Sequence, residues 1–169
     1  AGTVMVKDIN AGIGSSSPGD FTNVNGTLFF RANDGVHWAE LWKTDGTAAG
    51  TVMVKDIFTG TIGSYPGDLT NLNGTLYFEA FEGTDGQELW KSDGTAAGTM
   101  LVKDIIVGAG SASVANLTVV GSTLFFTAND SVNGTELWKS DGMARGWVAA
   151  ADIVSGSGSS GPGGEGNGW

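Results

Sequence analysis

The side chains that could carry chemistry in this sequence recur at a fixed spacing of 48 residues. General acid–base catalysis needs two carboxyl groups in different environments, so that one stays protonated while the other is ionised. The carboxylates here are the same in every unit, so we interpret them as scaffold and predict no catalytic residue. They are Glu40, Glu88, Glu136, Asp8, Asp56, Asp104 and Asp152. We expect Glu88 to pair with Lys103 or Lys55 on a neighbouring strand and so to fix register.

The tryptophan that follows each of these glutamates has two interpretations. Trp42, Trp90 and Trp138 either stack sugars in clefts between sheets, as in lectins, or pack between the sheets as core. We favour the core, because a residue present in every unit is one that the fold itself needs. Aromatic residues found in one unit only are better candidates for partner contacts. These are Trp38, Phe81 and Trp147.

Two other kinds of site find less support. His37 is the single histidine, and no nucleophile-elbow motif accompanies it, so we expect it in a surface loop. Oxygen-rich loops recur at one register position, and calcium favours oxygen ligands. Their spacing matches no EF-hand, so we favour solvated turns and leave calcium open as a cofactor. The calcium candidates are Asp34, Glu82, Asp85 and Asp130.

Composition limits the partners of this chain. With 8 Lys and Arg against 18 Asp and Glu, the formal charge is −10, and phosphates would be repelled. Nucleic acid and anionic membrane are therefore disfavoured. No apolar run approaches the roughly 20 residues of a membrane-spanning helix, so we expect no membrane span. The absence of cysteine excludes disulfides and leaves the redox compartment open.

Short strands separated by turns must position these residues. Residues 3–9 are rich in β-branched side chains and predict a strand. Residues 27–32, 40–43 and 51–57 predict three more, and Asn25-Gly26 is a strong hairpin signal.

Within residues 27–32, alternation places Leu28, Phe30 and Ala32 on one face. Every unit keeps this Leu-Phe-Ala face, so we expect it to pack against a neighbouring sheet. The opposite face varies between units, so we expect looser packing or solvent there.

Each unit therefore holds about four short antiparallel strands, which is the content of one β-propeller blade. The predicted fold is all-β, with units at about residues 10–57, 58–105 and 106–153, and with residues 1–9 as a strand of a preceding unit. Three blades are fewer than the four to eight of a usual ring. We therefore expect association with other protein chains, as a homo-oligomer with more blades or within a larger complex.

The end of the sequence differs from the repeats. Residues 154–169 are rich in glycine and serine and predict a flexible tail. The last residue, Trp169, is either a free end or an aromatic anchor on a partner.

The recurring sequence resembles the ELWxxDGT repeat family. Glu-Leu-Trp-Lys-Ser/Thr-Asp-Gly occurs three times, and the resemblance covers residues 1 to about 153. The third copy departs from the pattern at residues 143–147 and at Ala150-Ala151. The resemblance implies propeller-like blades and an extracellular, cell-surface or periplasmic setting, with no settled chemistry.

The Ser/Thr-Asp-Gly turn is also similar to the Asp-box of other propellers. An aspartate can accept backbone N–H groups within a tight turn, and glycine supplies the positive φ. We therefore expect Asp45, Asp93 and Asp141 to be structural. Taken with the repeats, this favours a non-catalytic structural or protein-binding module. A carbohydrate-binding lectin that uses clefts between blades is the alternative, and a glycosidase-like enzyme is a weaker one.

Overall fold

The computed structural model describes residues 2–141 and the backbone of residues 147–151. The chain is all-β, and its described strands form three four-stranded antiparallel sheets. The first sheet holds β1 (Gly19–Val24), β2 (Thr27–Asn33), β3 (Ala39–Thr44) and β4 (Val52–Lys55). The second holds β5 (Gly67–Leu72), β6 (Thr75–Glu82), β7 (Gly86–Ser92) and β8 (Met100–Lys103). The third holds β9 (Ala115–Val120), β10 (Thr123–Asn129), β11 (Thr135–Ser140) and β12 (Trp147–Ala151).

Each sheet is a meander in which consecutive strands pair, and each lies within one of the 48-residue units. Tight turns make this possible. Asn25 and Gly26 both have positive φ, 52° and 85°, as a two-residue type I′ hairpin requires. Asn73 and Gly74 repeat the same angles in the second sheet. Across the described residues there is no helix that could span a membrane.

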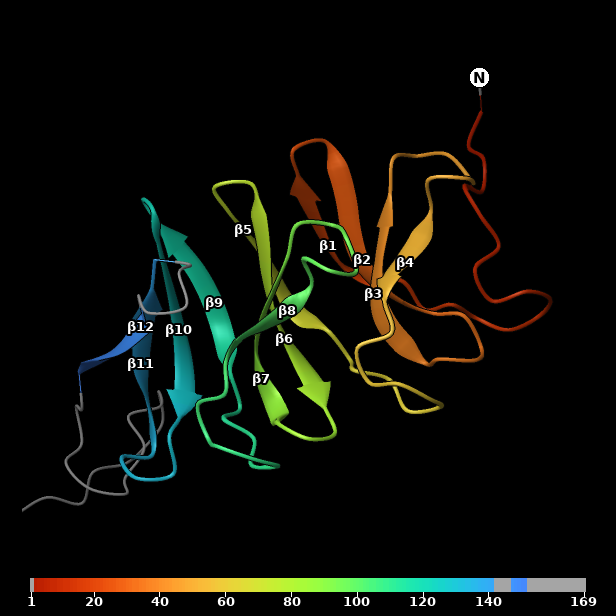
Figure 1. Ribbon diagram of the computed structural model, residues 1–169. Coiled ribbons are helices and arrows are strands. Elements are labelled where there is room, and N and C mark those ends of the chain that lie inside the picture. Colours follow the sequence, from red (N-terminus) through yellow and green to blue (C-terminus); the bar gives the residue numbers. More distant parts are fainter. Residues whose placement is uncertain (1, 142–146, 152–169) are drawn as a thin grey trace, which may run out of the picture.

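The three sheets stand side by side in sequence order, with the second between the other two (Figure 1). Their backbones approach most closely at the first strand of each sheet, where β5 lies against both β1 and β9. The N-terminal segment runs along the first sheet on the side away from the second sheet (Figure 1).

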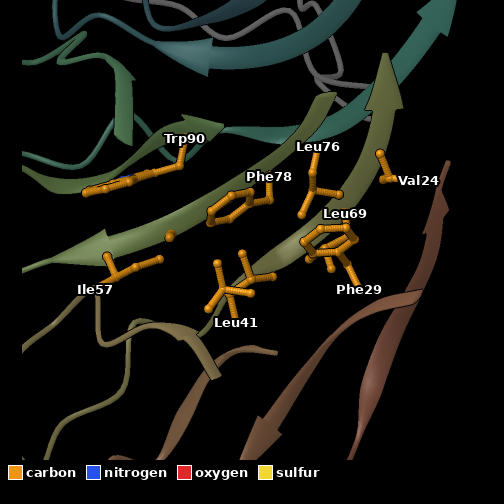
Figure 2. Close-up of a cluster of buried hydrophobic side chains, with 10 residues drawn as sticks. Val24, Phe29, Leu41, Ile57, Leu69, Leu76, Phe78 and Trp90 are labelled. Atoms are coloured by element: carbon orange, nitrogen blue, oxygen red, sulfur yellow. The ribbon is translucent and has the colours of Figure 1, made fainter. Parts of the chain in front are cut away.

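Apolar side chains fill the space between neighbouring sheets. Between the first and second sheets, Phe29 and Leu41 pack with Leu76, Phe78 and Trp90 (Figure 2). A second cluster joins the second and third sheets at the equivalent positions. It contains Leu72, Tyr77, Leu89, Val102, Ala112, Val114, Leu124, Phe126, Ala128 and Trp138.

The invariant Leu-Phe-Ala face is buried in the second and third sheets, as we expect from its repetition. The expectation of loose packing on the variable face is wrong for Phe29 and Tyr77, which are also buried. The reason is that Phe29 packs against the second sheet and Tyr77 against the third, so each apolar side chain meets a neighbouring sheet.

The repeated glutamates connect consecutive units. The fully buried Glu40 carboxylate accepts the backbone N–H of Ile57 at 3.1 Å and that of Ser64 at 2.7 Å. Glu88 accepts the N–H groups of Ile105 and Ala112, both at 3.1 Å. Burial raises the pKa of Glu40, and it raises that of Glu88 to about 7, against the lowering effect of these hydrogen bonds.

The expected pairing of Glu88 with Lys103 or Lys55 is therefore wrong. The Glu88 carboxylate accepts hydrogen bonds from backbone N–H groups of the segment that leads to the next sheet. Lys55 points instead toward the second sheet, where its Nζ donates to the carbonyl of Thr99 at 2.8 Å and lies 5.5 Å from the Trp90 ring centroid.

Residues 3–9, for which the sequence predicts a strand, are not a strand in the structure. Their sequence is identical to residues 51–57, which include β4. β4 forms because β3 lies beside it and supplies hydrogen-bond partners. Residues 3–9 have no such third strand next to them in the described part of the chain. The predicted tail, residues 154–169, lies outside the described residues.

Candidate functional site

The aspartates of the repeated turn hold that turn together. Asp45 Oδ1 accepts the backbone N–H of Thr47 at 2.9 Å and its hydroxyl at 2.7 Å. Asp93 makes the same two bonds to Thr95. The bonds from threonine lower the pKa of both aspartates, so the carboxylates are ionised in their turns. Residues 142–146, which follow Asp141, lie outside the described part.

The three repeated tryptophans lie inside the molecule. Trp42, Trp90 and Trp138 are all buried, each directly across the strand pair from a phenylalanine of the Leu-Phe-Ala face. Trp138 Nε1 donates to the carbonyl of Ala128 at 2.9 Å. In these positions the rings present no open face on which a sugar could stack.

Of the aromatics that occur in one unit only, Trp38 is exposed and adopts an unusual backbone conformation. Its φ is 55°, in the left-handed region that a bulky residue rarely occupies. At the same register position, 48 and 96 residues on, stand Gly86 and Gly134, with φ of 72° and 76°. The turn therefore suits glycine, and the first unit carries an exposed indole there instead. Such strain is one mark of a functional position.

The other two unit-specific aromatics, and Trp169 of the tail, differ in how far the structure describes them. Phe81 is partly buried and packs edge-to-face with Phe58, with ring centroids 5.3 Å apart. Trp147 opens β12, but its side chain lies outside the described part, as does the whole of Trp169.

Three of the four calcium candidates accept hydrogen bonds within their own turns, and the fourth, Asp85, takes part through its backbone N–H. Asp34 accepts hydrogen bonds from the backbone N–H groups of Val36 and His37. Its Oδ2 also lies 2.8 Å from Nδ1 of the His37 ring, and this side-chain hydrogen bond raises the pKa of His37. Asp130 accepts two N–H groups in the matching turn. Glu82 accepts the N–H groups of Thr84 and Asp85. Among the described residues, no three His, Asp or Glu side chains are grouped to hold a metal.

A charged group that the sequence analysis did not single out lies on the first two sheets. Arg31 on β2 pairs with Asp20 at 3.1 Å. Glu79 on β6 accepts the amide N–H of Gln87 at 2.7 Å. Burial, with the negative charges of Asp68 and Asp20, raises the pKa of Glu79 to about 7, while Arg31 opposes that rise. Glu79 is therefore a carboxyl that exchanges its proton near neutral pH.

A sequence signal for this group did exist. Arg31, Glu79 and Thr127 occupy one register position and differ in every unit. Their type and place on the variable face could have suggested it, but the burial that shifts the pKa of Glu79 is a property of the tertiary structure.

The most distinctive surfaces are the outer faces of the first and third sheets. Phe21 on β1 is 59 % exposed, whereas Leu69, its equivalent in the second sheet, is 9 % exposed. On the third sheet, Leu137 is 38 % exposed against 1 % for its equivalent Leu89, and Val120 is 61 % exposed against 3 % for Leu72. At Phe21, Val120 and Leu137, positions that are buried between sheets elsewhere are thus exposed at the two ends.

The open face of the first sheet carries a small apolar cavity of about 220 Å³. It lies between the N-terminal segment and the sheet, and Phe21, Leu28 and Phe30 form part of its wall with Val6 and Ile9. In the second sheet the space in front of the same face is filled by Phe29 and Leu41 of the first sheet. The cavity therefore lies on the face that corresponds to the one covered by the first sheet in the second sheet.

Comparisons of the chain with protein-family models, with curated proteins and with solved structures find no match.

Proposed function

We propose that this chain is a non-catalytic, propeller-type module that binds other protein through the outer faces of its first and third sheets. It would act as a structural component of an extracellular or periplasmic assembly. One observation carries the proposal. Equivalent apolar positions are buried between sheets and exposed at the two ends, as with Leu89 and Leu137.

Several features of the structure support a scaffold in preference to an enzyme. The glutamates Glu40 and Glu88 are fully buried and bonded to backbone N–H groups, so a substrate has no access to them. The turn aspartates Asp45 and Asp93 accept bonds from their own turns. These two glutamates and two aspartates therefore have structural partners, and the exposed apolar faces are the better candidates for interaction.

The packing also supports propeller-type blades. Each unit is a four-stranded meander, and neighbouring units approach most closely at their first strands. In a propeller, four-stranded blades are arranged around a central channel, so one edge strand of each blade lies nearest the axis. Added sheets at either end would continue the same arrangement.

The test compares how much partner protein is retained by the immobilised wild-type chain and by matched variants. Immobilised wild-type chain is expected to retain a partner protein, either added chain or a protein of the surrounding extracellular fraction. Phe21→Lys and Val120→Lys, which charge one open face each, should weaken retention at least tenfold. Val107→Lys changes an exposed valine in the loop between β8 and β9 and serves as control. Retention that is absent, or equal for all four chains, would refute the proposal.

A glycan-binding function is the alternative that the exposed Trp38 keeps open. Binding on a glycan array that Trp38→Ala abolishes, with capture of protein unaffected by Phe21→Lys, would favour a lectin over the proposed module. Release of sugar by the pure chain would favour a glycosidase.

A further inference from the structure

The two open faces are the two halves of an interface that the molecule already contains twice. In each internal interface, one sheet contributes the face of Leu41 or Leu89. The following sheet contributes the Leu-Phe-Ala-Trp face, for example Phe78 with Trp90. The third sheet leaves the first kind of face open at Val120 and Leu137. On the first sheet, no sheet covers the second kind of face: Phe30 and Trp42 are buried in a cluster that includes Ile9 of the N-terminal segment, and Phe21 is exposed. The outer face of the first sheet is therefore complementary to the outer face of the third sheet, and neither face is complementary to a second copy of itself.

Polar groups that hold the internal interface are also present at both ends. Thr22 Oγ1 donates to the carbonyl of Leu69 at 2.6 Å, and Lys43 Nζ donates to that of Gly94 at 2.7 Å. The third sheet carries the equivalent donors, Thr118 and Lys139, both exposed. The first sheet offers the equivalent acceptors, which are the backbone carbonyls of Phe21 and Gly46.

The N-terminal segment already lies where the last strand of a preceding sheet would lie. Lys7 Nζ donates to the carbonyl of Thr51 at 2.7 Å, and one unit later Lys55 donates to Thr99 at 2.8 Å. Ile9 packs against the open face of the first sheet, as Ile57 packs into the cluster before the second sheet. Residues 3–9 thus have the sequence and the place of a fourth strand, while Val4 and Met5 are exposed.

The fourth strand of the third unit matches the repeated sequence less well than residues 3–9 do. Its own fourth strand, β12, carries Ala149, Ala150 and Ala151 where β4 has Met53, Val54 and Lys55. It therefore lacks the lysine that reaches the next sheet and the larger apolar residues of the repeat.

We propose that the partner of this module is a second copy of the same chain, docked head to tail. Residues 3–9 of one copy pair with β11 of the other in place of β12, and the open face of the first sheet packs on that third sheet. This inference rests on the proposed function, and it identifies the bound protein as a second copy of the chain. The reciprocal contact closes a dimer with six sheets, within the four to eight of usual rings. Because each copy carries a charge of −10, the dimer should be tighter at high salt.

The first test is the native mass, measured by sedimentation equilibrium over a range of concentrations. We expect about twice the 17.2 kDa of the chain. Phe21→Lys and Val120→Lys should each weaken dimerisation at least tenfold without changing the circular dichroism, whereas Val107→Lys should not. Deleting residues 2–9 should give a monomer, and ending the chain at residue 146 should leave a dimer. A monomer at every concentration would overturn the inference.

An engineered disulfide tests the strand pairing itself. Because the chain has no cysteine of its own, any disulfide must form between the introduced residues. The hydroxyls of Thr44 and Thr51 touch at 2.7 Å across β3 and β4, as do those of Ser92 and Thr99 in the second sheet. The equivalent pair across two copies is Ser140 with Thr3. The double variant Thr3→Cys/Ser140→Cys should form a covalent dimer under oxidation, and each single variant should not. A dimer without this cross-link, or one that Thr3→Cys alone forms as well, would refute the pairing.

These outcomes separate the two proposals. A monomeric chain that still retains another protein through the Phe21 face refutes the second copy as partner and leaves the proposed function standing. A monomeric chain that retains nothing refutes both.

Discussion

Glu40 and Ser64 belong to different units and are joined by two hydrogen bonds. The Glu40 carboxylate accepts the backbone N–H of Ser64 at 2.7 Å and its hydroxyl at 2.6 Å. Both residues are fully buried. The glutamate that opens the repeated sequence is therefore a connection between one sheet and the segment that leads to the next.

Replacing Glu40 should destabilise the fold strongly. Glu40→Ala leaves the N–H groups of Ile57 and Ser64 and the Ser64 hydroxyl buried without an acceptor, and each such group costs about 1–3 kcal/mol. We expect the free energy of unfolding in urea to fall by about 3 kcal/mol or more. Glu82→Ala, which removes a carboxylate from a hairpin turn, should cost under about 1 kcal/mol. A small effect of Glu40→Ala would show that water replaces the carboxylate.

Equivalent leucines should differ in their contribution to stability. Leu89→Ala opens a cavity between the second and third sheets and should cost about 2–5 kcal/mol. Leu137→Ala, at the same position of the third sheet, should cost about 1 kcal/mol or less because the side chain is partly exposed. Urea unfolding of the chain without residues 2–9, which we expect to be a monomer, measures both. Equal costs would mean that the outer face of the third sheet is covered.

Stability should fall as pH rises through neutrality. Glu79 and Glu88 have pKa values of about 7 in the folded chain, against an ordinary value of 4.5. At these two groups the folded chain therefore binds more protons than the unfolded chain between about pH 4.5 and 7. The stability that they contribute is fully present below that window and is lost as the pH rises through 7. We expect a higher melting temperature at pH 5 than at pH 8.

The net negative charge acts in the same direction, so a matched pair of variants is needed. Glu79→Gln keeps an acceptor for Gln87 and removes the titration, so it should flatten the pH dependence. Glu82→Gln removes the same charge from the end of the same strand and should leave the dependence steep. If both variants behave alike, the dependence comes from net charge and not from Glu79.

Trp38→Gly should make the chain more stable. Trp38 has a φ of 55°, and a left-handed conformation costs a residue with a side chain about 1–2 kcal/mol. Part of the gain is offset by the greater entropy of glycine in the unfolded chain, which leaves about 0.5–1 kcal/mol. Trp38→Ala keeps the Cβ and should show no such gain. A stability loss for Trp38→Gly would mean that the indole itself holds the turn.

Local features of the fold follow from the sequence because they depend on neighbouring residues. Asn25-Gly26 makes its turn from its own backbone angles, and alternation in residues 27–32 sets which side chains share a face. The bonds of Asp45 reach only two residues along the chain. The 48-residue period then predicts the same all-β unit three times.

Burial and pairing between units required the tertiary structure. Leu89 and Leu137 have the same neighbours in sequence, yet one is buried and the other partly exposed, because a sheet covers only the first. Residues 3–9 repeat residues 51–57 without forming a strand, since a strand needs a partner beside it. Glu88 bonds to groups 17 and 24 residues away and not to a lysine across the sheet. The sequence by itself determined the unit, and contacts between units decided which copies of each residue are open to a partner.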